Sequence, residues 1–94
     1  MTDLEKEKRK GEHAGRLLQD ELLKEILDDL EKQIIDKWEQ TPARDKEARE
    51  ELWLFYVAAK KLRNTLQSCF ETGEMAKLQL EQSMKEKVVN FFKG

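Results

Sequence analysis

The chain has 94 residues, of which 40% are charged and 38% hydrophobic, and its 20 acidic and 18 basic side chains leave a net charge of −2. A chain of this length is expected to form a single domain, residues 1–94, with a thin core, because it buries only about 60–65% of its unfolded surface. Four glycines and one proline are few for a protein rich in loops. The composition therefore predicts an all-α protein with long exposed helices and argues against a sheet.

The cysteine and histidine content and the hydropathy of the chain exclude several further classes of protein. The single Cys69 rules out an internal disulfide, and with His13 as the only histidine a closed zinc site is excluded too. We expect an intracellular, reducing setting and no cofactor. No apolar run approaches the roughly 18–20 residues of a membrane span, and the start "MTDLEKEKRK" lacks the apolar stretch of a secretory signal. The sequence thus predicts a soluble, unprocessed chain.

A charged segment, residues 1–16, precedes the first strong helical pattern, residues 17–40. Apolar side chains recur every four residues from Leu18 to Trp38, so one face of this helix is apolar and the other charged. Asp20 followed by Glu21 offers an alternative helix start, which would make the first twenty residues a separate short helix.

The stretch "QTPARD" predicts a turn at residues 41–45. Thr41 precedes the only proline and should end the first helix, while Pro42 suits the first position of a new helix with Thr41 as its N-cap. Short connections between helices usually give antiparallel neighbours. We therefore expect an antiparallel helical hairpin.

The second helix is predicted to span residues 46–93 and carries a heptad seam, which requires a partner helix. A turn at Pro42 opposes Leu30 to Phe55 and Leu23 to Leu62. Gly73 leaves two alternatives open, namely an interruption at residues 72–74 or a continuous, gently bent helix. The expected core comprises Leu23, Leu27, Leu30, Ile34, Trp38, Leu52, Phe55, Ala59, Leu62 and Leu66.

Aromatic and apolar residues outside this seam predict a second interface. Trp53 lies beside the seam with Tyr56 and Val57 on the next turn, and the apolar stripe of the tail "MKEKVVNFFKG" drifts round the helix. Such a tail is also typical of a membrane-surface helix, although docking on a partner explains it equally well. The predicted interface residues are Trp53, Tyr56, Val57, Met84, Val88, Phe91 and Phe92.

No residue pattern predicts catalysis. The acidic run from Asp28 to Asp36 lacks the Glu-x-x-His motifs of a di-metal bundle, so it is interpreted as a solvated face. His13 has no nucleophile at helical spacing and is interpreted as a surface residue. Cys69 lies on the apolar seam, which favours a packing role. We expect no catalytic residues and no metal site, and thus no enzyme.

Charge is distributed unevenly along the chain. Residues 17–39 hold eight acidic and three basic residues, a net charge of −5, whereas residues 40–63 hold six basic and four acidic residues, a net charge of +2. The basic face of residues 44–63 is a candidate for phosphate binding, and "KEKRK" is a weaker one because glutamates surround it. The acidic balance and the lack of a helix-turn-helix pattern argue against DNA binding without excluding it.

Three stretches, "GEHAGRLLQDELL", "WEQTPARDKEAREELW" and "ETGEMAKLQL", resemble a group of short α-helical proteins encoded by tailed bacteriophages and prophages. The resemblance covers roughly residues 11–80. It implies a viral origin and carries no enzymatic motif, and it leaves out the charged N-terminal run and the Phe91–Phe92 tail.

Together these features predict a non-enzymatic phage protein that acts through helix-mediated assembly, as a virion or DNA-packaging component. One alternative is a binding protein that inhibits or redirects a host polymerase, nuclease or defence factor, and another is a DNA-binding accessory or regulator. The expected partner is a second copy of the chain or another phage protein, with a host protein as the alternative. The expected location is the host cytoplasm or the virion.

Overall fold

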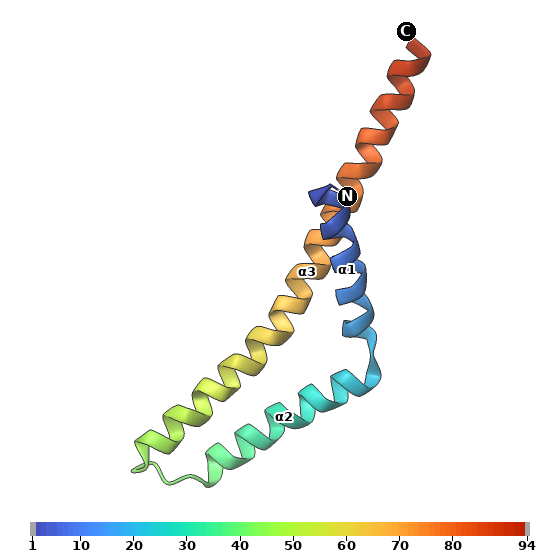
Figure 1. Cartoon of the computed structure of the whole chain (residues 1–94). Coiled ribbons are helices and arrows are strands. Elements are labelled where there is room, and N and C mark those ends of the chain that lie inside the picture. Colours follow the sequence, from blue (N-terminus) through green and yellow to red (C-terminus); the bar gives the residue numbers. More distant parts are fainter. Residues whose placement is uncertain (1, 94) are drawn as a thin grey trace. The chain divides into compact units, whose positions relative to one another are not determined.

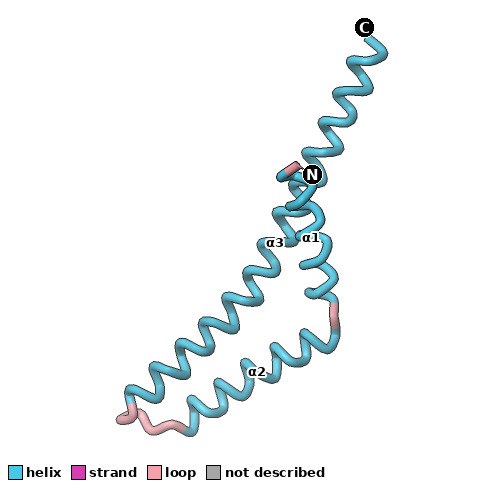
Figure 2. Tube along the Cα trace, viewed as in Figure 1, coloured by secondary structure: helices cyan, strands magenta, loops and turns pink. Residues whose placement is uncertain are grey.

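The structure is a computed structural model that describes residues 2–93, and these residues form three α-helices (Figure 1). They are α1 (Asp3–Gln19), α2 (Glu21–Gln40) and α3 (Lys46–Lys93). Short loops separate the helices, and residues 2–93 contain no strand (Figure 2). The prediction of an all-α protein is confirmed. None of these helices combines the length and the apolarity needed to cross a membrane.

Asp20 separates α1 from α2. Its backbone is extended, with φ −68° and ψ 116°, and its carboxylate accepts a hydrogen bond from the Leu23 amide at 2.8 Å. This N-cap fixes the start of α2 at Glu21, because the carboxylate satisfies an amide that the first helical turn leaves without a partner. The predicted helix over residues 17–40 is therefore too long at its start, and the alternative start at Asp20 is the one observed.

The turn between α2 and α3 occupies the predicted residues, 41–45, but the residues that cap the helices differ from the predicted ones. Thr41 caps the end of α2, where its hydroxyl donates to the Lys37 carbonyl at 2.7 Å. The Pro42 carbonyl accepts from the Asp45 amide at 3.0 Å, and the Asp45 carboxylate accepts from the Ala48 amide at 3.2 Å. Asp45, and not Thr41, thus caps α3, and Pro42 belongs to the turn and not to the first position of the helix.

The contacts divide the chain into two compact units. The α1 unit consists of Met1–Leu17 and Leu66–Gly94, and the α2 unit consists of Leu18–Thr65. Helix α3 contributes its second part to the α1 unit and its first part to the α2 unit.

Two glycines bring the helices of the α1 unit into close contact. A Cβ atom added to Gly11 would lie 2.5 Å from the Cα of Gly73 and 2.9 Å from the carbonyl oxygen of Cys69. Ala14 and Ala76 are also buried. Residues 72–74, where the sequence allowed an interruption, lie inside α3. Gly73 therefore allows a close approach of two backbones, one of the general uses of glycine.

Leu27 and Ala59 are the buried residues of the α2 unit, each 6% exposed. Leu23, Ile34 and Leu52 are half-buried, as is Leu66 in the other unit. The four remaining predicted core residues are 40–56% exposed, which contradicts a core role within the single chain: Leu30, Trp38, Phe55 and Leu62. The reason is geometric, since a helix with one neighbour can cover only part of a broad apolar stripe.

Candidate protein-binding surface

A network of ion pairs joins α2 to the first part of α3. The Arg63 guanidinium lies 2.8 Å from Asp28 Oδ1 and 3.2 Å from Glu31 Oε1, and Lys60 Nζ lies 3.4 Å from Glu31 Oε2. Burial lowers the pKa of Arg63, but the hydrogen bond to Asp28 and the negative charge of Glu31 outweigh it and raise that pKa above its ordinary value. Arg63 therefore keeps its charge throughout the physiological pH range.

Arg49 joins the same two helices close to the turn. Its Cζ atom lies 3.6 Å from the centroid of the Trp38 ring, a cation–π contact. Its Nη1 atom donates to the carbonyl oxygen of Thr41 at 2.8 Å and to that of Trp38 at 3.3 Å. Trp38 thus contacts Arg49, and Glu31 contacts Lys60 further along both helices.

We expect Arg49→Lys to lower the free energy of unfolding by about 1–2 kcal/mol, because lysine cannot both stack on Trp38 and donate to two carbonyls. Urea unfolding followed by tryptophan fluorescence measures the change. Arg44→Lys is the matched control, since Arg44 is exposed and takes part in none of the hydrogen bonds or ion pairs of the described residues. Equal effects of the two substitutions would contradict the role assigned to Arg49.

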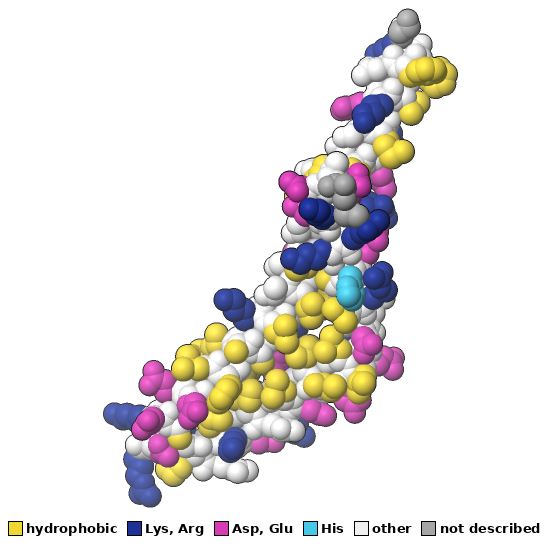
Figure 3. All heavy atoms as spheres, in the orientation of Figure 1, with side chains coloured by type: hydrophobic (Ala, Val, Ile, Leu, Met, Phe, Trp, Pro, Cys, Tyr) yellow, Lys and Arg dark blue, Asp and Glu magenta, His cyan; other side chains and the backbone are white. Residues whose placement is uncertain are grey.

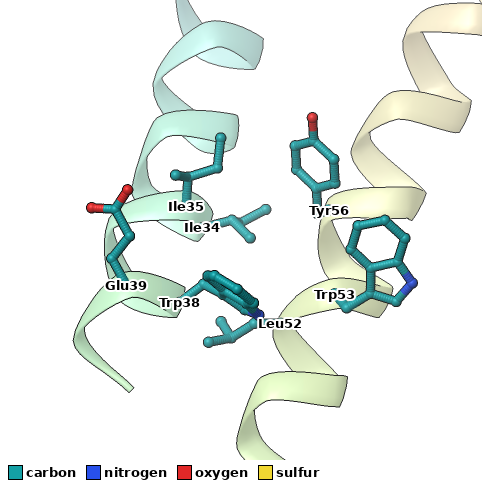
Figure 4. A pocket seen from close by; sticks show the side chains of 7 residues that line it. All are labelled: Ile34, Ile35, Trp38, Glu39, Leu52, Trp53 and Tyr56. Carbon is teal, nitrogen blue, oxygen red and sulfur yellow. The ribbon is translucent and has the colours of Figure 1, made fainter. Parts of the chain in front are cut away.

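One side of the α2–α3 pair carries an apolar pocket of about 280 Å³, the Trp groove. Figure 4 shows that α2 and α3 both contribute to it, with the Ile34 and Trp38 side chains directed toward α3 and Glu39 turned away. The rings of Trp53 and Tyr56 lie 5.8 Å apart. The pocket is lined by Ile34, Ile35, Trp38, Glu39, Leu52, Trp53 and Tyr56.

A second and larger groove of about 470 Å³ shares only Ile34 and Leu52 with the Trp groove. Helical geometry places the remaining lining residues of the two grooves on opposite sides of the line from Ile34 to Leu52. Apolar side chains gather over α2 and the first part of α3 in Figure 3. The second groove is lined by Leu30, Gln33, Ile34, Lys37, Leu52, Phe55, Ala58, Ala59 and Leu62.

The residues predicted as an interface are distributed over both units. Trp53 and Tyr56 line the Trp groove, and Val57 is exposed on the same helix without lining it. Met84, Val88, Phe91 and Phe92 belong to the α1 unit and are 54–81% exposed, and the two phenylalanine rings pack edge to face at 5.5 Å. Their role as an interface stays a prediction.

Leu22 and Ile26, both more than half exposed, extend the apolar stripe of α2 beyond the larger groove. Their spacing of four residues, shared with Leu30, places them on this stripe in the sequence, but they were not among the predicted interface residues. Sequence reasoning missed one feature of the α1 unit, the close contact of Gly11 with Gly73, for which the spacing of Gly11 and Gly15 by four residues was a weak signal.

The basic face proposed for DNA is already engaged with α2 to a large extent. Of its six basic residues, Lys60 and Arg63 lie in ion pairs with α2 and Arg49 stacks on Trp38. Phosphate binding there would compete with these contacts. The described part of the chain holds no group of three His, Cys, Asp or Glu side chains that could bind a metal ion.

Comparison of the chain with models of protein families, with characterised proteins and with solved structures found no match.

Proposed function

We propose that this chain is a small non-enzymatic protein that acts through helix-mediated assembly, as a virion or DNA-packaging component of a tailed phage. The observation that supports this best is the excess of exposed apolar surface. Among the described residues, four hydrophobic side chains are buried, whereas 17 large ones are exposed. Soluble monomers rarely expose large contiguous apolar patches, which mark sites of association.

In this proposal the working element is an antiparallel hairpin of α2 and the first part of α3. The contacts of Arg49 with Trp38 and of Arg63 with Asp28 and Glu31 support it, because they join the two helices both near the turn and further along their length. A two-helix layer with apolar residues on both sides has only a small core of its own. Association with further helices completes such a core, as in helical bundles.

Light scattering coupled to size-exclusion chromatography tests the assembly. We expect a mass of at least two chains at micromolar concentration, since the burial of apolar surface drives association. A chain that stays monomeric at this concentration would contradict the proposal.

The viral part of the proposal is supported by the resemblance of residues 11–80 to short phage proteins, and it places the protein in the host cytoplasm or the virion. Mass spectrometry of purified virions and the identity of the neighbouring genes test it. Neighbouring capsid or packaging genes would support a structural role, and a chromosomal setting without phage genes would contradict it.

The Trp groove favours a second candidate function, the binding of a host protein. It combines two tryptophans and a tyrosine with the acidic helix α2, and such aromatic residues are enriched where binding energy concentrates. Affinity capture from host lysate, compared between wild type and Trp53→Ala, tests this function. A single stoichiometric host protein that is lost with Trp53→Ala would favour it over assembly.

A further inference from the structure

We infer that a second copy of this chain docks on the apolar side of the α2–α3 pair opposite the Trp groove, so that two such pairs form a four-helix bundle. We call this side the leucine face and define it by Leu22, Ile26, Leu30, Phe55 and Leu62. The inference rests on the proposed assembly function and specifies its surface and its partner. All five residues belong to the α2 unit.

The leucine face supplies most of the apolar surface that a stable dimer requires. Its five defining side chains are 43–65% exposed. An aromatic side chain such as Phe55 offers roughly 150–250 Å² of surface and an aliphatic one less, so the five expose on the order of 400 Å². A standard interface buries about 800 Å² per partner, and about 65% of a homodimer interface is apolar, which gives about 520 Å². A second copy can therefore cover the face without a contribution from another protein.

Net charge selects one way of stacking the two pairs. Helix α2 has seven acidic and three basic residues, net −4, whereas residues 46–65 of α3 have five basic and three acidic residues, net +2. A two-fold axis across the helices would place α2 on the partner's α2 and juxtapose two negative helices. A two-fold axis along the helices places α2 on the partner's α3, which brings opposite charges together.

Charged residues at the edges of the leucine face fit the second arrangement. The contacts of Trp38 with Arg49 and of Glu31 with Lys60 place position 37 level with about 51, and position 29 level with about 61. Lys37 would therefore face Glu51 of the second copy, and Asp29 would face its Lys61. These four residues take part in no ion pair of the described chain, so each remains available to a partner.

Substitution of Phe55 tests the face itself. Phe55 is 56% exposed, so Phe55→Glu should leave the helix content seen by circular dichroism unchanged. We expect it to weaken dimerisation about 100-fold, because it buries two charges in an apolar contact. Leu54→Glu is the matched control, since Leu54 is 60% exposed and lines neither groove.

Charge reversal and crosslinking test the arrangement. Lys37→Glu and Glu51→Lys should each lower the affinity of the dimer about tenfold, and the double variant should restore it. Lys32→Glu, which makes the same charge change at an exposed position of α2, is the control and should have little effect. In a Cys69→Ser background, a mixture of Lys37→Cys chains with Glu51→Cys chains should form a disulfide-linked dimer. Neither variant alone should do so.

The outcomes separate this inference from the proposed function. An assembling wild-type chain whose Phe55→Glu variant still dimerises would overturn the leucine face and leave the assembly function standing. Crosslinking of Lys37→Cys chains with one another would overturn the arrangement, because it places α2 on α2. A wild-type chain that is monomeric throughout would overturn both.

Discussion

Gly73→Ala is expected to release α1 from its contact with α3, although alanine is the better helix former. The added Cβ would lie 2.5 Å from the Gly11 Cα and 3.0 Å from the Glu7 carbonyl oxygen. Both are backbone atoms, so neither can rotate away, and the two helices must separate. Overpacking of this kind weakens a contact by about 1–3 kcal/mol. Alanine also raises the helix propensity of α3 by about 1 kcal/mol, but this gain stabilises α3 itself and not the docking of α1.

Hydrogen exchange of the α1 amides measures this effect. A loss of 1–3 kcal/mol corresponds to a decrease in protection of roughly 5- to 150-fold. Gly15→Ala is the matched control, because its added Cβ would meet the ring of Phe70 at 2.9 Å, and a side chain can shift. If Gly73→Ala left α1 protection unchanged, or if both variants had the same effect, the close contact of Gly11 and Gly73 would be wrong.

Leu27→Ala is expected to lower the free energy of unfolding by about 2–3 kcal/mol, the lower part of the range for truncation of a buried leucine. Leu27 is 6% exposed, and few other side chains of the α2 unit are buried with it. A two-layer contact has little further core to compensate for the cavity. Chemical denaturation followed by circular dichroism measures the change.

Leu54→Ala provides the comparison for Leu27→Ala, since it removes the same atoms from a side chain that is 60% exposed. We expect its effect to stay within about 0.5 kcal/mol. Similar losses for the two variants would show that Leu27 has no special role in the contact between α2 and α3.

The helical class of the fold could be predicted from the sequence because periodicity is a local property. The four-residue repeat from Leu22 to Trp38 lies within α2, and the heptad seam lies within α3. The positions of the helix ends could be predicted less accurately, since they depend on which of several polar side chains forms the cap. Thr41 and Asp45 both have side chains suited to an N-cap. The structure shows that Thr41 caps the end of α2 and that Asp45 caps the start of α3.

Burial could be predicted only in part, because periodicity shows which face is apolar and not how much of that face a neighbour covers. Leu27 and Ala59 are buried as expected, whereas Phe55 and Leu62 on the same seam remain exposed. The contact of Gly11 with Gly73 joins residues far apart in the sequence, and glycine is used equally for breaks and for close packing. Whether a glycine breaks a helix or allows close packing depends on whether a second backbone lies against it, and the sequence alone does not show this.

The proposed antiparallel pairing of α2 with the first part of α3 is the central claim, because the leucine face depends on it. Nitroxide labels at Glu25→Cys and Asn64→Cys in a Cys69→Ser background test it directly, since both positions are exposed and level with each other along the observed contacts. Dilution with unlabelled protein isolates the distance within one chain. Paired helices lie 8–10 Å apart, so we predict a narrow distribution at or below about 30 Å with the label arms included. A distance near the roughly 58 Å that separates positions 25 and 64 in one straight helix would contradict the pairing.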